Sequence, residues 1–380
     1  MKYKMSIFTL LTIFFVCLNG SAYTKENRES TPTKKNKQRF EKACSPDRRN
    51  HPEFDNSVFA EADFIYWYVD QEGNAYASTG SYFIEPRPLV PISYQGQVYA
   101  PNSKANPGFK VALGSNLSFD QWDVLVRYSW LNSNPSSSVT STDGYSGIVP
   151  LFIYSVGGSG VLSLAGTGGS VDPTTYVSEA TANWHYYLNA IDSELGKTTF
   201  VTPAFDARVN FGLKGSWQRE TLNLQYLVTH STGLLGNNTI NCNQFFWGIG
   251  PRVGIDTDWN ILPPYALFND SNLSANLVAA SAISALFSNF SVVAKSFDTE
   301  IGSYSSILVA NQKYSVTKLI PVVEMLLGVE IKGSYSDCSR WVIGLGWENQ
   351  IWFSMNQHSS SVPDIDLSFS GLTFKARYDF

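Results

Sequence analysis

Few residues of this chain have the types and spacing that chemistry requires. Its four histidines lie in unrelated segments and no pair has metal-ligand spacing, so the sequence predicts neither a metal nor a cofactor. Ser159 lies in GGSGV, which lacks the second glycine of a nucleophile elbow. His230 and Ser231 are adjacent and would point to opposite faces of a strand, which makes them a poor catalytic pair. We therefore expect a protein that is not an enzyme.

The cysteines are the remaining reactive groups. Cys17 lies in a segment that we expect to be removed, which leaves Cys44, Cys242 and Cys338. An odd number in an oxidising compartment means that at least one is free or paired with another chain. A bond from Cys44 to Cys338, a bond from Cys44 to a neighbouring molecule and an inert Cys242 thiol all stay open.

The amino-terminal segment is typical of a secretory signal peptide. Lys2 and Lys4 precede the apolar run 7–18, and the small residues 20–22 follow it. The run is too short for a bilayer, which needs roughly 20 helical residues. We expect a signal peptide over 1–22.

A basic stretch without apolar periodicity follows over residues 23–56. It predicts a flexible periplasmic leader, or alternatively a tether to an anionic envelope polymer or lipid head group. The folded part, 57–380, is acidic. The whole chain has 16% charged and 14% aromatic residues, which excludes disorder and lacks the basic excess of a nucleic-acid binder.

Two-residue alternation begins at residue 58 and recurs along the folded part. In 205–217, Val209, Phe211 and Leu213 share one face, and charged or polar residues share the other. Further segments of this kind occur at 58–69, 109–117, 122–130, 222–228, 245–256, 319–332, 341–350 and 371–380.

The direction of the apolar face decides the fold class. A soluble sandwich buries that face, whereas a membrane barrel turns it to lipid and lines its interior with polar residues. Strands of ten or more residues, aromatic residues at strand ends and alternating short and long connections favour the barrel. We predict an all-β fold, an antiparallel transmembrane β-barrel of about 12 strands (10–16), with long external loops and short periplasmic turns, over residues 57–380. The closing strand ends on Phe380, which we expect to be the assembly signal of an outer-membrane barrel.

Three segments leave the topology open. Residues 205–228 are either two strands joined at 218–220 or one long strand, and Cys242 is periplasmic in the first case and external in the second. Residues 273–288 are Ala-rich enough for a helix, with a strand as the alternative. Loops 70–106 and 132–182 are expected to be external. The apolar patch 148–156 in the second loop predicts a constriction, an extra hairpin or a contact between protomers.

The polar faces of the predicted strands supply the candidate pore lining. Charges of both signs occur there, so we expect at most a slight preference for cations. The candidates are Glu61, Asp63, Lys110, Asp123, Arg127, Asp206, Arg208, Lys214, Arg252, Glu324, Glu330, Lys332, Glu348, Lys375 and Arg377.

Five segments carry a resemblance to a known family. FAEADFIYW at 59–67, WHYYLNAIDSELG at 184–196, FFWGIGPRVGIDTDW at 245–259, GLGWENQIWF at 344–353 and GLTFKARYDF at 371–380 resemble the pore-forming major outer membrane proteins of legionellae and chlamydia-like bacteria. The resemblance implies an integral outer-membrane porin for small hydrophilic solutes and ions that is also a structural envelope protein.

The same resemblance indicates the partners. It implies contact with outer-membrane lipid and lipopolysaccharide, folding by the barrel-assembly machinery, and homo-oligomers that include disulfide-linked ones. No nucleic acid is expected. The alternative function is a surface adhesin or structural barrel without an open pore.

Overall fold

The computed structural model describes residues 58–79, 96–117, 121–141, 148–152, 175–202, 204–230, 233–262, 273–300, 306–336, 339–357 and 365–380. Within these ranges every regular element is a β-strand, as the two-residue alternation predicts. No helix there is long and apolar enough to cross a membrane. The predicted signal peptide and leader lie outside the described residues.

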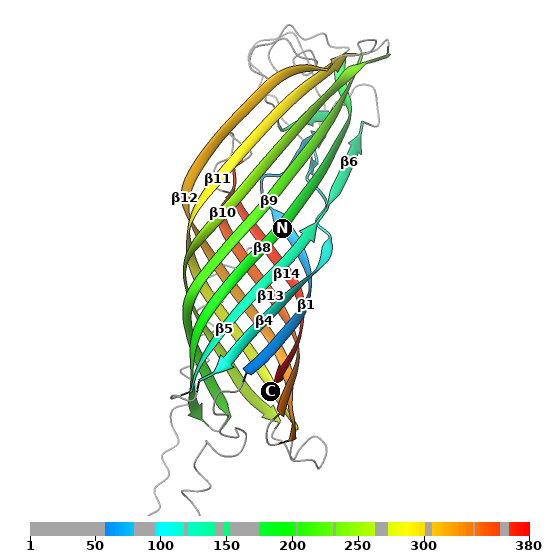
Figure 1. Cartoon of the computed structure of the whole chain (residues 1–380). Coiled ribbons are helices and arrows are strands. Elements are labelled where there is room, and N and C mark those ends of the chain that lie inside the picture. Colours follow the sequence, from blue (N-terminus) through cyan, green and yellow to red (C-terminus); the bar gives the residue numbers. More distant parts are fainter. Residues whose placement is uncertain are drawn as a thin grey trace, which may run out of the picture. The chain divides into compact units, whose positions relative to one another are not determined.

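Ten of the described strands form a closed ring of antiparallel neighbours (Figure 1). They are β1 (Val58–Gln71), β4 (Ala105–Asn116), β5 (Trp122–Ser133), β8 (Thr175–Thr202), β9 (Phe205–His230), β10 (Gly233–Leu262), β11 (Leu273–Glu300), β12 (Ile307–Ser336), β13 (Ser339–Asn356) and β14 (Ile365–Asp379). The ring runs β8-β5-β4-β1-β14-β13-β12-β11-β10-β9, and β9 pairs back to β8. Ten strands lie at the lower end of the predicted range.

Two of the segments whose topology the sequence left undecided belong to continuous strands. β9 runs through Gln218–Glu220 without a turn, so 205–228 is one long strand. β11 includes the Ala-rich residues 273–288 and pairs along its length with β10 and β12, so this segment is a strand and not a helix.

Four short strands extend the sheet beyond the ring. They are β2 (Ala77–Thr79), β3 (Val98–Tyr99), β6 (Ser136–Thr140) and β7 (Ile148–Pro150). β7 belongs to the apolar patch 148–156 and pairs with β2 and β8, so the described part of this patch adds a strand to the sheet. The remainder of the patch, 153–156, lies outside the described residues. The predicted loops 70–106 and 132–182 thus contain strand, and β8 begins inside the second.

The two ends of the ring differ in their connections. At one end, called the terminal end here, β1 begins and β14 ends, and the Phe380 N–H donates to the Val58 carbonyl at 2.9 Å. At the other, called the distal end, β1, β5, β9, β11 and β13 end. The connections β1–β4 and β5–β8 at the distal end are long, but β9 and β10 are joined there by a short one.

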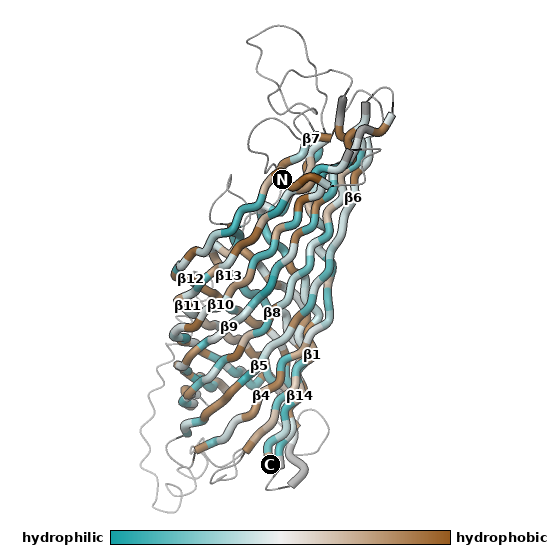
Figure 2. Tube along the Cα trace, turned by 45° about the horizontal axis from the view of Figure 1, so that its top comes forward, coloured by the Kyte–Doolittle hydropathy of each residue, from teal (hydrophilic) through white to brown (hydrophobic). Residues whose placement is uncertain are grey.

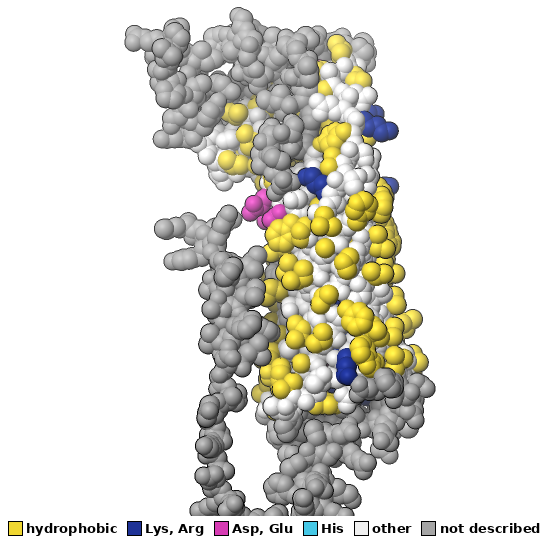
Figure 3. Space-filling view, turned by 90° about the vertical axis from the view of Figure 1, so that its left-hand side faces the viewer, with side chains coloured by type: hydrophobic (Ala, Val, Ile, Leu, Met, Phe, Trp, Pro, Cys, Tyr) yellow, Lys and Arg dark blue, Asp and Glu magenta, His cyan; other side chains and the backbone are white. Residues whose placement is uncertain are grey.

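The outer face of the ring is apolar near the terminal end. On β9, Val209, Phe211, Leu213 and Trp217 are exposed, and the equivalent positions of the other strands carry Val, Ile, Leu and aromatic residues. Figure 2 shows polar and apolar residues alternating along the strands, and Figure 3 shows a broad field of hydrophobic side chains on one face. We call this surface the lipid-facing belt. Aromatic side chains such as Trp217 and Trp347 lie at its distal edge, where a membrane barrel places its girdle.

The apolar face changes sides along β9. From 209 to 217 the exposed apolar residues have odd numbers, whereas Leu222, Leu224, Tyr226 and Val228 have even numbers and are fully buried inside the ring. The barrel prediction turned the apolar face of 222–228 to lipid, and this was wrong, because that face lies inside the ring. The strand itself is regular. We interpret the change as the level at which the outer surface of the ring leaves the lipid and meets water. β14 shows the same change, because Leu367 and Phe369 are buried while Leu372 and Phe374 are exposed.

The distal half of the ring has its own apolar core. Phe246 packs on Phe290 with ring centroids 4.9 Å apart, and Tyr186 packs on Phe369 at 5.7 Å. Because these inward side chains come from different strands, they tie the long strands together beyond the lipid-facing belt. The distal cluster is Trp67, Tyr186, Phe246, Phe290, Trp352 and Phe369 with their buried neighbours.

Candidate functional site in the barrel interior

The interior of the ring at the level of the lipid-facing belt is charged. Pleating sends alternate residues of each strand inward, so the exposed positions on β1 alternate with the buried Glu61 and Asp63. Lys110 on β4 and Lys214 on β9 are buried in the same way. Burying a charge is costly unless it is paired, and the interior supplies the pairs.

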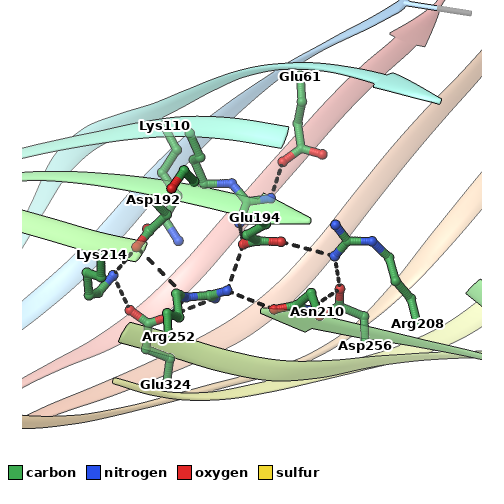
Figure 4. Close-up of polar contacts among 12 residues, drawn as sticks. Glu61, Lys110, Asp192, Glu194, Arg208, Asn210, Lys214, Arg252, Asp256 and Glu324 are labelled. Atoms are coloured by element: carbon green, nitrogen blue, oxygen red, sulfur yellow. Dashed lines mark hydrogen bonds and ion pairs between the residues drawn. The ribbon is translucent and has the colours of Figure 1, made fainter. Parts of the chain in front are cut away.

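Glu194 lies at the centre of these pairs (Figure 4). Its carboxylate accepts from Arg252 at 2.8 Å and from Arg208 at 3.0 Å, and Arg127 lies 3.7 Å away. These four side chains come from β5, β8, β9 and β10. Glu194 therefore joins strands that lie up to three places apart around the ring.

A second carboxylate continues the network to β12. Glu324 accepts from Lys214 at 2.6 Å and from Arg252 at 3.0 Å, and Lys214 also contacts Asp192 at 2.7 Å. Arg252 thus bridges the two buried carboxylates Glu194 and Glu324. The contact between β9 and β12 passes over two intervening strands, so it crosses part of the lumen.

On the other side of the ring, an ion pair also joins two strands that are not neighbours. Lys110 on β4 donates to Glu348 on β13 at 2.5 Å and lies 4.7 Å from the centre of the Trp67 ring. Thr373 donates a further hydrogen bond to Glu348 at 3.0 Å. These contacts pass across β1 and β14.

A third group lies toward the terminal end. Lys375 contacts Glu61 at 3.3 Å and Glu330 at 3.1 Å, and Glu61 accepts from Arg127 at 2.9 Å. Lys332 continues this group with Glu330 at 3.6 Å and also pairs with Asp258. Glu61 therefore links the terminal group to the network around Glu194.

The predicted lining residues share the inner face, and most enter ion pairs. Arg208 contacts Asp123 at 2.6 Å, and Arg377 contacts Asp379 at 2.7 Å. Two residues stay outside these pairs within the described part of the chain. Asp206 forms no ion pair there, and the buried Asp63 has one carboxylate oxygen without a hydrogen-bond partner.

The sequence-based set lacked the two central residues of β8, Asp192 and Glu194. Their signal was present, because Ile191, Ser193 and Leu195 alternate with them in the segment AIDSELG. Asp258, the partner of Lys332, was also missed.

A polar collar separates the charged network from the distal cluster. Glu220 accepts from Trp184 at 2.9 Å and from Gln244 at 3.1 Å, while Tyr186 donates to Gln218. Above this collar the inner wall is mostly apolar.

A buried tyrosine ties the short strands to the distal core. The Tyr226 hydroxyl donates to the Tyr76 carbonyl at 2.7 Å, and burial raises the pKa of Tyr226. The contact joins β9 to the segment just before β2, so the short strands are held against the inner face of the distal half.

Of the cysteines, only Cys242 lies within the described residues. Cys242 lies within β10 on the distal side of the belt, with its side chain buried inside the ring. Because 205–228 is one strand, this is the external alternative for Cys242. Cys44 and Cys338 lie outside the described residues, so their predicted pairing stays a prediction.

An antiparallel ring of strands with an apolar outer belt and a charged interior defines the class of membrane β-barrels. The family model described as "Legionella pneumophila major outer membrane protein precursor" matches residues 50–380. The chain belongs to this family, and it is an outer-membrane β-barrel protein.

Solved outer-membrane proteins resemble the chain only distantly. The outer membrane protease OmpT of Escherichia coli has 12% identity and a TM-score of 0.39, covering 89% of this chain and 98% of that one. A major outer membrane protein of Thermus thermophilus has 12% identity and a TM-score of 0.26, covering 86% and 99%. Ail of Yersinia pestis has 8% identity and a TM-score of 0.21, covering 86% and 100%. The comparison with curated protein sequences gave no match.

Proposed function

We propose that this protein is a low-conductance porin for passive diffusion of small hydrophilic solutes and ions. The observation that supports it is the charged interior at the level of the lipid-facing belt. Charged side chains that face a lumen set the selectivity of a path across the membrane, whereas a lumen filled by apolar side chains at this level would leave no such path. The charged residues hold this wall together through their ion pairs, and we assign them no catalytic step.

The network also restricts the proposed path. Arg252 and Lys214 reach across the lumen to Glu324, so their side chains occupy space that a wide channel leaves to water. We take the ten strands of the ring as the membrane wall in place of the twelve first expected. Eight strands leave an interior filled by side chains and sixteen to eighteen leave an aqueous channel, so ten strands indicate a narrow pore.

The balance of charge suggests a slight preference for cations. More carboxylates than basic side chains enter the described ion pairs. The carboxylates are Glu61, Asp123, Asp192, Glu194, Asp256, Asp258, Glu324, Glu330, Glu348 and Asp379, and the bases are Lys110, Arg127, Arg208, Lys214, Arg252, Lys332, Lys375 and Arg377.

Liposome swelling with solutes of graded size tests the porin function. Liposomes that contain the refolded chain should swell in small sugars and amino acids and exclude larger oligosaccharides. Protein-free liposomes and liposomes that contain heat-denatured chain serve as controls. Swelling no faster than in the controls for every solute would reject diffusion through this barrel.

A second candidate is a structural or adhesive barrel without an open pore. The distal cluster favours it, because buried aromatic side chains from several strands fill the inner face beyond the belt. Binding of intact cells to host surfaces that is lost with the protein, together with no solute flux, would support this candidate.

We also propose that Cys44 links neighbouring molecules. The odd number of cysteines in the expected mature chain and the family membership support this. Non-reducing electrophoresis of isolated envelopes should show oligomers that collapse with thiol. Unchanged migration of a Cys44→Ser variant would exclude this residue as the cross-linker.

A further inference from the structure

The outer face just beyond the lipid-facing belt carries a set of exposed cations on one side of the ring. Arg219 on β9 follows the aromatic edge residue Trp217 by two positions, and both point outward. Lys295 on β11 and Lys313 on β12 are also outward and exposed. Figure 3 shows Lys and Arg side chains beyond the hydrophobic field, with Asp or Glu side chains at the upper edge of the field. We call these three residues the basic set.

The strand register brings the two lysines together. Lys295 pairs with Asn311, and Lys313 pairs with Val293, so the lysines are diagonal neighbours on adjacent strands. Such neighbours lie about 7–8 Å apart, within reach of long side chains. Like charges at this spacing repel each other, and a bound anion would relieve the repulsion.

The strand register places no carboxylate directly beside these charges within the described residues. Tyr187 and Phe245 lie opposite Arg219, Val293 lies opposite Lys313, and Asn241 and Asn311 lie opposite Lys295. None of the three cations forms an ion pair with another described residue. On the β1 side of the ring the charge just beyond the belt is mixed, because Asp70, Glu72 and Lys104 are exposed there. The basic set is therefore confined to one side.

The heights of the three cations fit one kind of ligand. At about 3.3 Å per residue, Arg219 lies about 7 Å along its strand from Trp217. Lys313 is six residues beyond Leu319 of the belt, and Lys295 is eight residues beyond Phe287. For strands tilted by about 45°, these distances place Lys313 about 14 Å and Lys295 about 19 Å above the belt edge. An outer-leaflet glycolipid has its phosphates directly above its acyl chains and its acidic sugars higher still.

We propose that the basic set binds lipopolysaccharide, with Arg219 at the lipid phosphates and the Lys295 and Lys313 pair at the acidic groups of the core sugars. The acyl chains of the same molecule lie on the belt of β9 to β12, where Trp217, Phe245 and Phe287 are exposed. Adjacent amide side chains such as Asn223 and Asn243 supply hydrogen bonds to sugar hydroxyls. The proposal depends only on the outer surface and holds whether or not the lumen conducts.

Binding of phosphorylated lipopolysaccharide to the full-length chain in detergent micelles tests this assignment. The triple variant Arg219→Gln, Lys295→Gln and Lys313→Gln should bind it about tenfold or more weakly, because each cation near an anionic lipid surface contributes about 1 kcal/mol. Wild-type protein should lose a similar factor when the lipopolysaccharide is enzymatically dephosphorylated, and the triple variant should lose much less. The exchange of Lys295 and Lys313 for Arg should retain binding.

Matched controls separate the alternatives. Lys104→Gln removes an exposed cation from the other side of the ring and should leave binding unchanged. Inorganic phosphate at the same phosphate concentration should not displace the glycolipid, and displacement by it would show a simple anion site in place of a lipid site. Wild-type affinity of the triple variant, with its thermal midpoint unchanged, would overturn the proposal.

Discussion

Glu194 shows at the scale of single residues how the interior is stabilised. Guanidinium groups from three other strands surround its buried carboxylate. Each charge has lost its hydration, so each depends on its partners, and removal of one partner leaves an uncompensated charge. Among these partners, Arg252 also forms an ion pair with a second buried carboxylate, because it contacts both Glu194 and Glu324.

Replacement of Arg252 by Ala should destabilise the barrel. Removing one partner of a buried ion pair costs about 3–5 kcal/mol, and contacts of Lys214 and Arg208 with the two carboxylates reduce this loss. Equilibrium unfolding by urea in lipid vesicles measures the change in the free energy of unfolding. Arg219→Ala, which removes an exposed guanidinium from β9, should stay close to wild type. Equal stability of the two variants would show that the network contributes little.

Ion selectivity belongs to the same scale. Since carboxylates exceed basic groups in the described interior pairs, the reversal potential in a salt gradient should show a slight preference for cations. Glu330→Gln removes one carboxylate of the terminal group and should reduce this preference. A wild-type reversal potential that indicates strong anion selectivity contradicts this account of the interior.

β9 shows at the scale of an element how one strand serves two environments. Its outward side chains are apolar up to Trp217, where they meet lipid, and its inward side chains are apolar from Leu222, where they form the distal core. The polar residues between these levels, Gln218 and Glu220, form the collar. The strand is therefore pleated regularly throughout, while the face that carries its apolar residues depends on whether lipid or water lies outside the ring.

Arginine substitutions along β9 should locate the lipid-facing belt. Leu213→Arg places a cation among lipid chains and should cost about 2–4 kcal/mol near the middle of the bilayer. Asn223→Arg, an outward position beyond the belt on the same strand, should be nearly neutral. Urea unfolding in vesicles of fixed composition compares the two variants. A similar cost at both positions would place the membrane boundary elsewhere.

This change of face explains what the sequence could and could not predict. Alternation identified the wall strands other than β8 and β11, and the inner positions Glu61, Lys110 and Arg208, because pleating alone decides the face of a residue. It left 205–228 ambiguous, since a shift in apolar parity has the same form as a turn between two strands. Partners such as Lys110 and Glu348 lie far apart in sequence and meet only through closure of the ring, so no local pattern predicts them.

At the scale of the whole molecule, the ring has two regions with different interiors. Near the terminal end the belt encloses a charged network, and toward the distal end the long strands enclose an apolar cluster. Strands of 26–30 residues from β8 to β12 exceed the roughly 9–11 residues that cross a bilayer, so they continue well beyond it. We expect the termini to lie in the periplasm, which would place the distal region outside the cell.

Thiol labelling of intact cells tests this orientation. Asn223→Cys lies outward on the distal part of β9 and should react with a membrane-impermeant maleimide, whereas Lys197→Cys near the terminal end should react only after the outer membrane is broken. Parent protein without substitution gives the background from its own cysteines. Labelling of Lys197→Cys in intact cells would reverse the topology.

Single-channel recording of the refolded full-length chain in planar bilayers tests the central claim, a charged interior that forms a restricted pore. Wild-type protein should give small conductance steps. Arg252→Ala should give larger steps, because it removes a side chain that crosses the lumen, and Arg219→Ala should leave the step size unchanged because its side chain points outward. The absence of channels from all three proteins at every protein concentration would contradict the claim.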